Sequence, residues 1–258
     1  MTGDATVVDE GAPADGLREL SELPLPDTRM RFLSIREGAT FRPLEQRDRH
    51  ESIAELALAD SVPEQVRTHY DTARNLYLYA WHVYRFHVVA EHQALASLEM
   101  ALRLALVQLG KLDENGALLD TPGRQTNAKR PPAPLGLSRL LSMALQSGLI
   151  SNAGLTRRNL WAQKLAERRR SIEQIEFMTK HQLQELTIPD TPAVPTEDEL
   201  AYDWLTDFIE TLPRLRNEYA HGTQMLHASV LMTFQIVSDL TSQLWPGRAN
   251  EGEASNSP

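Results

Sequence analysis

Apolar side chains recur at intervals of three and four residues along most of the chain beyond residue 60, the pattern of helices that bury one face. The longest such stretch covers residues 63–110, with Pro63 in its first turn and Ser61 as a cap. One stripe within it consists of Leu95, Leu98, Leu102, Leu106 and Leu109. Because the stretch is longer than an ordinary globular helix, we expect two helices or one bent helix, with a change of direction near residues 88–91.

Two further helical patterns follow a loop at residues 111–134, which is rich in glycine and proline. Residues 137–145 predict a short helix that ends at Gly148. Thr156 caps the next predicted helix, which carries an apolar stripe. This stripe consists of Trp161, Leu165, Ile172, Ile175, Leu183 and Leu186.

The C-terminal part of the chain predicts a capped helix, a break at a proline and a last apolar helix. Thr196 and Glu199 form a capping-box pattern at the start of the first of these. Its apolar side chains are Leu200, Trp204, Phe208 and Leu212. Pro213 kinks or restarts this helix, because proline removes a backbone donor and crowds the preceding turn. Residues 223–245 predict the last helix.

Residues 1–60 form an acidic extension in which helical periodicity is weak. We expect residues 1–28 to be disordered or loosely attached, because they hold few large apolar side chains. Two extended pieces, residues 30–35 and 40–44, predict a small hairpin, and residues 51–59 predict a short helix.

Together these elements predict an all-α fold, an antiparallel helix bundle over residues 61–247 with a short N-terminal extension and a disordered tail at residues 248–258. The composition is that of a soluble globular protein, with 41% hydrophobic and 24% charged residues. No apolar run predicts a membrane span, and the acidic start is not typical of a signal peptide, so we expect a cytoplasmic location without membrane contact. Without cysteine there is no disulfide, no thiolate nucleophile and no cysteine zinc site.

Chemically distinctive residues gather in residues 212–222, where Arg216, Asn217 and His221 precede a glycine. Asn217 and His221 are four residues apart and share a helix face. Histidine accepts a proton near neutral pH, and arginine presents a permanent cation with a fork of donors. This combination is suited to phosphate ester chemistry, in which one group moves a proton and another stabilises negative charge.

The sequence Arg216-Asn217, three residues and His221 resembles the signature of the HEPN superfamily (higher eukaryotes and prokaryotes nucleotide-binding), and the local form Arg-Asn-x-x-Ala-His-Gly is typical of several of its branches. The resemblance covers residues 65–246. It implies a bundle with the motif in the penultimate helix. The stretch 96–103 also looks like an early HEPN helix, which makes Glu99 a supporting residue of the site.

The resemblance implies a metal-independent endoribonuclease that needs no cofactor. In such an enzyme the ribose 2′-hydroxyl attacks the neighbouring phosphate and leaves a 2′,3′-cyclic phosphate. His221 would act as general base or acid, Arg216 would stabilise the pentavalent phosphate, and Asn217 would orient one of them or the substrate. The resemblance further implies a homodimer with a composite site, and a toxin or an effector in antiviral defence or stress, regulated by an antitoxin or another protein.

Two alternatives stay open. The first is a non-catalytic HEPN module that binds RNA, a nucleotide or a protein partner. The second is that His221 is only a helix-end residue, favourably placed at the negative end of the helix dipole. In the toxins that are silenced by nucleotide addition, a tyrosine follows two residues after the histidine; Thr223 stands there in this chain, so that regulation is not expected.

The net charge of −9 is unevenly distributed. Residues 121–172 hold ten basic side chains and one acid, Glu167, so this block carries +9. Such a block favours RNA backbone contacts, the alternative being a solvated helix face beside a basic loop. The residues expected to bind RNA are Arg124, Lys129, Arg130, Arg157, Arg158, Lys164, Arg168, Arg169 and Arg170.

Other constellations give weaker signals. His82, His87 and His92 recur every five residues, a spacing that spreads them around a helix, so we expect no metal site. The aromatic side chains of residues 70–84 favour packing over base stacking. Glu99 and Arg103, four residues apart, predict an ion pair within one helix.

Overall fold

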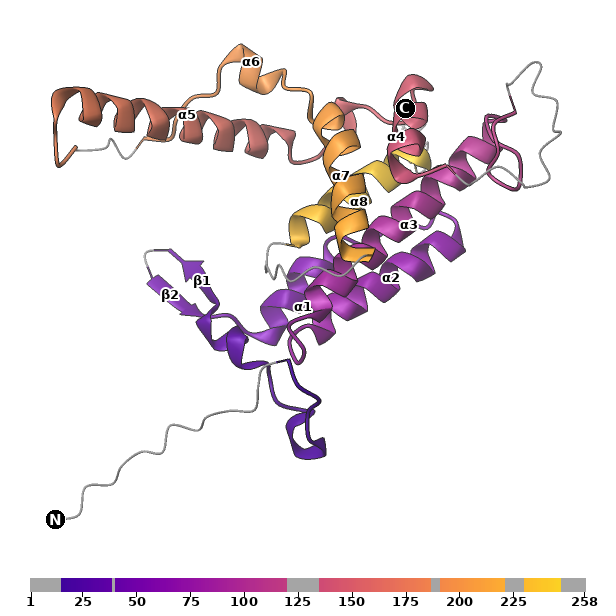
Figure 1. Cartoon of the computed structure of the whole chain (residues 1–258), viewed down its shortest axis with the longest axis horizontal. Helices are drawn as coiled ribbons and strands as arrows, with labels where there is room; N and C mark the ends of the chain where they lie inside the picture. Colours follow the sequence, from indigo (N-terminus) through magenta and orange to yellow (C-terminus); the bar gives the residue numbers. More distant parts are fainter. Residues whose placement is uncertain (1–14, 39, 120–134, 187–190, 221–229, 247–258) are drawn as a thin grey trace, which may run out of the picture.

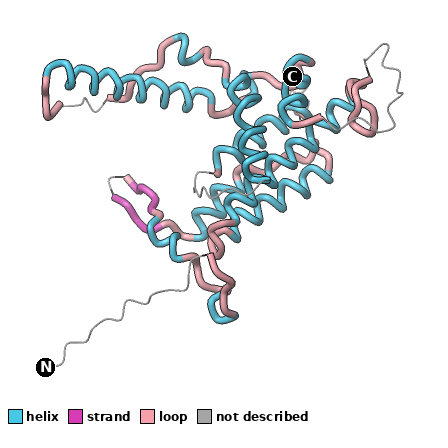
Figure 2. Tube along the Cα trace, viewed as in Figure 1, coloured by secondary structure: helices cyan, strands magenta, loops and turns pink. Residues whose placement is uncertain are grey.

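The computed structural model describes residues 15–38, 40–119, 135–186, 191–220 and 230–246, which are mostly helical (Figures 1 and 2). The bundle consists of α2 (Glu64–Tyr79), α3 (Phe86–Gln108), α4 (Leu137–Gln146), α7 (Trp204–Ala220) and α8 (Leu231–Leu244). Helix α3 is central, because it packs against α2, α4, α7 and α8. Within the described residues the all-α prediction is confirmed, and no helix there is long and apolar enough to span a bilayer.

The change of direction expected near residues 88–91 lies earlier, in the turn between α2 and α3 at residues 80–85. Asp27 holds this turn from the N-terminal region. Its N–H donates to the carbonyl of Trp81 at 2.8 Å, and its carboxylate accepts from the N–H of Tyr84 at 3.1 Å. A contact between residues so far apart in sequence leaves no trace in local periodicity, which explains the error.

The core forms around the leucine stripe of α3. Its buried members are Leu95, Leu98, Leu102 and Leu106. Leu109 follows the last residue of α3 and is 45% exposed, so the predicted stripe is one turn too long. Phe234 of α8 packs against the same core, with its ring 5.7 Å from that of Tyr70, whose hydroxyl donates to the Phe234 carbonyl. Tyr70, Tyr77 and Tyr84 are all buried, which confirms packing over base stacking for these three.

The predicted N-terminal hairpin is present as antiparallel strands β1 (Ser34–Glu37) and β2 (Thr40–Pro43). The first extended piece is shorter than predicted, because Met30 lies in the 3-10 helix Thr28–Phe32. Two more 3-10 helices span Leu20–Glu22 and Asn152–Gly154.

Helix α1 spans Gln46–Ala54, so the predicted helix at residues 51–59 was placed too late. A carboxylate capping box accounts for the early start: Asp48 accepts from the backbone N–H that precedes the helix. Ile53 and Leu56 join the core, so this part of the predicted extension packs on the bundle.

Two predicted caps have other partners. The Ser61 hydroxyl donates to the carbonyl of Trp245 at 2.8 Å, and the Thr156 hydroxyl donates to the carboxylate of Asp239 at 3.0 Å. Neither side chain caps the helix that follows it. Both hydroxyls instead hold their segments against α8 or its C-terminal end.

Helix α5 (Arg158–His181) projects from the bundle, and the chain returns along it through the short helix α6 (Glu197–Leu200) (Figure 1). Within the described residues, the side chains of α5 that are buried lie in its first turns. Trp161 packs on Trp204 and Phe208 of α7, at ring distances of 5.2 and 5.5 Å.

The apolar stripe predicted along this helix is therefore buried only near its start. Ile172, Ile175 and Leu183 are 47%, 63% and 42% exposed. Leu186 is half-buried in the segment after the helix. Periodicity identifies the side of a helix that favours burial, but it does not supply the partner that covers it.

The predicted capping box of Thr196 and Glu199 is confirmed, but α6 ends at Leu200 and a separate helix, α7, begins at Trp204. Helix α7 continues through Pro213, so of the two expected effects, a kink or a restart, the restart does not occur. The last helix is confirmed over Leu231–Leu244.

Candidate functional site

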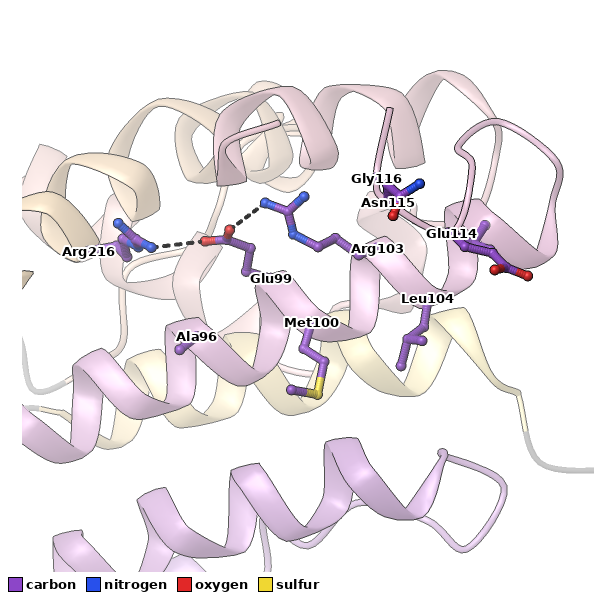
Figure 3. A pocket seen from close by; sticks show the side chains of 10 residues that line it. Ala96, Glu99, Met100, Arg103, Leu104, Glu114, Asn115, Gly116 and Arg216 are labelled. Carbon is purple, nitrogen blue, oxygen red and sulfur yellow. Dashed lines mark hydrogen bonds and ion pairs between the residues drawn. The ribbon is translucent and has the colours of Figure 1, made fainter. Parts of the chain in front are cut away.

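The C-terminal half of α7 places Arg216 against α3 (Figure 3). Arg216 Nη2 lies 3.4 Å from Glu99 Oε2. The other oxygen of Glu99 accepts from Arg103 Nη2 at 2.7 Å. One carboxylate therefore bridges two guanidinium groups, one from each helix, and the predicted ion pair within α3 is confirmed. We call Arg103, Glu99 and Arg216 the charged bridge.

Arg103 is held in place by more than Glu99. Its guanidinium also donates to the carbonyl of Leu135, at the entrance to α4. The backbone of Gly116 lies on its other side, so close that a Cβ there would be 3.1 Å from Arg103 Nη1. The sequence indicated the Glu99 partner but neither of these backbone contacts.

The charged bridge has a net charge of +1 and remains accessible. The side chains of Glu99, Arg103 and Arg216 are 16%, 24% and 36% exposed. Because all three keep contact with solvent, each ion pair is worth about 1 kcal/mol or less. Within the described residues, Arg216 Nε is buried without a hydrogen-bond partner. The bridge can therefore rearrange around an incoming anion at small cost, and arginine is the residue best matched to phosphate.

Two cavities meet at the charged bridge. The first, about 420 Å³, brings Arg216 and Asn217 of the motif together with Arg103, Glu99 and the start of α4. We call it the motif cavity. Its remaining lining residues are Leu135, Gly136, Leu137, Ser138 and Pro213. No side chain caps the N-terminus of α4, so backbone donors and two guanidinium groups adjoin this cavity.

The second cavity, about 450 Å³, lies along α3 on the other side of the bridge. Its wall combines the charged bridge with apolar side chains of α3 and with the loop at residues 113–117. We call it the apolar cavity. Its lining residues besides the bridge are Ala96, Met100, Leu104, Val107, Glu114, Asn115 and Gly116.

His92 lies two turns before Glu99 on the same face of α3 and is half-buried. Burial lowers its pKa from 6.5, the Arg216 cation lowers it further, and Glu99 acts in the opposite direction. The imidazole is therefore neutral at physiological pH. From the sequence, His92 was considered only as a metal ligand, although its seven-residue spacing from Glu99 places both on one helix face.

The three histidines of that spacing have separate surroundings. His82 Nδ1 contacts the carbonyl of Leu25, and His87 is buried beside Tyr84. Within the part of the chain that the structure describes, no group of histidine and acidic side chains is arranged for a metal ion.

A second carboxylate fixes the end of α7. Glu91 of α3 is buried and accepts from the Tyr219 hydroxyl at 2.7 Å and from the Thr233 hydroxyl of α8. Burial, and then the Glu91 carboxylate, raise the pKa of Tyr219 above its usual range, so the phenol stays a donor. Neither residue was singled out from the sequence. The sequence feature that could have identified Glu91 is its position as an acidic residue among the alanines of α3 that are buried.

His221, the remaining motif residue, lies outside the described residues, as do Thr223 and three of the basic residues expected to bind RNA. Those three are Arg124, Lys129 and Arg130.

Of the basic residues expected to bind RNA, those that the structure describes lie on α5 or directly before it. Helix α5 lies away from α3 (Figure 1). Arg169 is paired with Glu199 at 2.9 Å, and Arg170 donates to the carbonyl of Thr191, so both hold the returning chain. The others are exposed: Arg157, Arg158, Lys164 and Arg168. The structure thus divides the basic block between internal pairing and solvent.

The comparisons with known proteins add no relative: no protein-family model, curated protein or solved structure matches the chain.

Proposed function

We propose that this protein is a metal-independent endoribonuclease of the HEPN type, which binds the scissile phosphate of RNA in the motif cavity. One observation carries the proposal: Arg216 and Asn217 line one cavity together with Arg103 and the uncapped start of α4. These groups offer charged and neutral donors around a space of about 420 Å³. Such an arrangement favours an anion over a neutral ligand.

The proposed reaction is an in-line transfer within the RNA. The ribose O2′ forms a bond to phosphorus, the bond from phosphorus to O5′ breaks, and the products are a 2′,3′-cyclic phosphate and a 5′-hydroxyl. A base takes the proton of the 2′-hydroxyl, and an acid gives a proton to the departing O5′. We assign one of these transfers to His221, with Arg216 stabilising the charge on phosphorus and Asn217 orienting the phosphate. Glu99 positions Arg216.

Purified protein incubated with total RNA in EDTA tests the proposal. We expect cleavage with cyclic phosphate ends, and no cleavage of DNA or of RNA whose 2′-oxygens are methylated. His221→Ala and Arg216→Ala should remove most of this activity, whereas Arg214→Ala, at an exposed position on the same helix, should not. Cleavage that EDTA abolishes and one metal restores would contradict the mechanism.

The non-catalytic HEPN module remains the second candidate, and one observation favours it. Glu99 already neutralises part of the charge of Arg216, which suits reversible anion binding as well as catalysis. In that case wild-type protein would bind single-stranded RNA without cutting it, and Arg216→Ala would weaken binding. The proposed endoribonuclease is further expected to be a homodimer in the cytoplasm, to act as a toxin or defence effector, and to have a regulatory protein partner.

A further inference from the structure

The apolar cavity has no role in the chemistry proposed above, although it shares Arg103, Glu99 and Arg216 with the motif cavity (Figure 3). We infer that it receives the base of the nucleotide whose phosphate is bound at the charged bridge, and that this contact gives the protein a preference among RNA sequences. The inference rests on the proposed function, because it takes the ligand to be an RNA strand.

The apolar flank of the cavity comes from one face of α3. Ala96, Met100 and Leu104 are spaced four residues apart, and Val107 follows after three, so they form a continuous row. Figure 3 shows Ala96, Met100 and Leu104 along α3, with Glu99 and Arg103 on the same helix. A row of this kind offers a surface on which the face of a base can lie out of water.

The opposite flank is a loop that is ordered by its own hydrogen bonds. The Asp113 carboxylate accepts from the N–H groups of Asn115 and Ala117 at 2.9 and 2.8 Å. Gly116 adopts a positive φ of 78°, and a bridge joins Leu112 to Leu118. The wall is therefore formed before any ligand binds, which reduces the entropic cost of binding.

Asn115 supplies the group that could distinguish bases. Its side chain is exposed at the cavity and makes no hydrogen bond within the described residues. An amide carries both donors and an acceptor, the complement of a base edge. Glu114, next to it, disfavours a phosphate at this end of the cavity, so the anionic part of the ligand is expected at Arg103 and Arg216.

The size and polarity of the cavity fit this ligand. A volume of about 450 Å³ lies in the range of small-ligand sites. A nucleotide has one flat, largely apolar part and one anionic part, and the site has an apolar flank next to two guanidinium groups. A strand that crosses the bridge can therefore place a phosphate in the motif cavity and a neighbouring base in the apolar cavity.

The test compares RNA oligomers that protein cannot cleave. Single-stranded octamers with 2′-O-methyl riboses are prepared with each of the four bases, together with an abasic octamer of the same charge. Fluorescence anisotropy should show wild-type protein binding at least one base-containing octamer about tenfold or more tightly than the abasic one, as expected for one stacked base. Equal affinity for all five oligomers would overturn the inference.

Two substitutions test whether the apolar cavity is the source of the preference for base-containing octamers. Leu104→Trp fills it, and Asn115→Ala removes the amide from an exposed position where folding is not at risk. Both should reduce the preference for bases while leaving the affinity for the abasic octamer unchanged. The matched control is Leu109→Ala, next to α3 but outside the cavity lining. A preference that survives Asn115→Ala and a folded Leu104→Trp would overturn the inference.

Two further arms separate the possible ligands and the two proposals. A nucleoside monophosphate that binds as tightly as the octamers would identify a free nucleotide, and an acidic peptide that displaces them with equal affinity would identify a protein. Either result overturns the RNA assignment. If wild-type protein and the cavity variants cut unmodified RNA alike and with the same sequence preference, the inference fails and the proposed function stands. If the variants change the base preference of binding but wild-type protein cuts no RNA, the inference stands and the proposed endoribonuclease activity fails.

Discussion

Two basic regions of this molecule differ in how they use their charge. Helix α5 and the residue before it hold six basic side chains of the predicted RNA-binding set, but Arg169 and Arg170 hold the returning chain and the others face solvent. The charged bridge has only two arginines, yet both line cavities and share one carboxylate. The density of basic residues along the sequence therefore identified the α5 region. The charged bridge is identified only in the structure, where Arg103 of α3 and Arg216 of α7 meet at one carboxylate.

The difference separates two tasks in RNA recognition. Exposed cations attract a polyanion from a distance and bind its backbone without regard to sequence. Arginines in a cavity fix one phosphate in a defined position, as chemistry requires. We therefore expect α5 to contribute affinity and the charged bridge to contribute cleavage.

The largest expected effect is at the motif. His221→Ala should lower the cleavage rate by roughly 10²–10⁴-fold, the range for loss of a general base. Arg216→Ala should lower it by roughly 10²–10³-fold, as for other donors to a developing charge. Initial rates on a labelled RNA measure both, with melting temperature as the control for folding. If either variant unfolds, that side chain is structural, and for His221 the helix-end alternative is preferred.

The next largest effect is expected for substitutions on α5, which should weaken RNA binding. Reversing the charge of Arg157, Arg158, Lys164 and Arg168 should weaken RNA binding for unrelated sequences alike, because these side chains are exposed and unpaired with acids in the described part of the chain. Each lost phosphate contact should reduce the slope of log affinity against log salt by about 0.7.

A matched variant sharpens this test. Arg169→Glu reverses the charge of a side chain that is already paired with Glu199. It should therefore lower the melting temperature but leave the salt slope of RNA binding nearly unchanged. If the fourfold variant binds RNA with unchanged affinity and slope, the comparison breaks, and α5 is better interpreted as a docking surface for an acidic protein.

A smaller effect is expected at Glu99. Glu99→Gln keeps the shape of the side chain but frees two arginines from their shared anion, which raises the charge of the bridge from +1 to +2. RNA should bind a few-fold more tightly, with a salt slope steeper by up to about 0.7. Cleavage should nevertheless slow, because Arg216 loses the group that positions it. Faster cleavage would show that Glu99 only restrains the site.

The helices and their order were largely predictable from the sequence, because a buried face repeats at a helical period wherever a partner covers it. The α2–α3 turn, the start of α1 and the course of α5 were not. They depend respectively on Asp27 reaching the turn, on a carboxylate cap, and on the absence of a covering partner in the described residues. Each of these is a tertiary or unusual local contact that periodicity does not encode.

The site was predictable in its motif but not in its surroundings. Arg216 and Asn217 were identified by their spacing, and Glu99 by its helix; the structure places all three at the motif cavity. Arg103 was interpreted only as a partner of Glu99, and Asn115 was only part of a predicted loop with no assigned role. Cavities arise where several segments meet, so their lining follows from packing and not from any single stretch of sequence.

The smallest expected effect is a pH dependence of stability at His92. Burial and then the Arg216 cation lower its pKa in the folded protein below the unfolded value of 6.5. The folded state therefore binds this proton less readily than the unfolded chain, and stability is lost as pH falls through this range. In His92→Gln the melting temperature should fall less between about pH 8 and about pH 5 than in wild-type protein. Arg216→Ala should remove part of the same difference, because it removes one of the two causes. Identical pH profiles for wild type and His92→Gln would show that His92 is not coupled to the charged bridge.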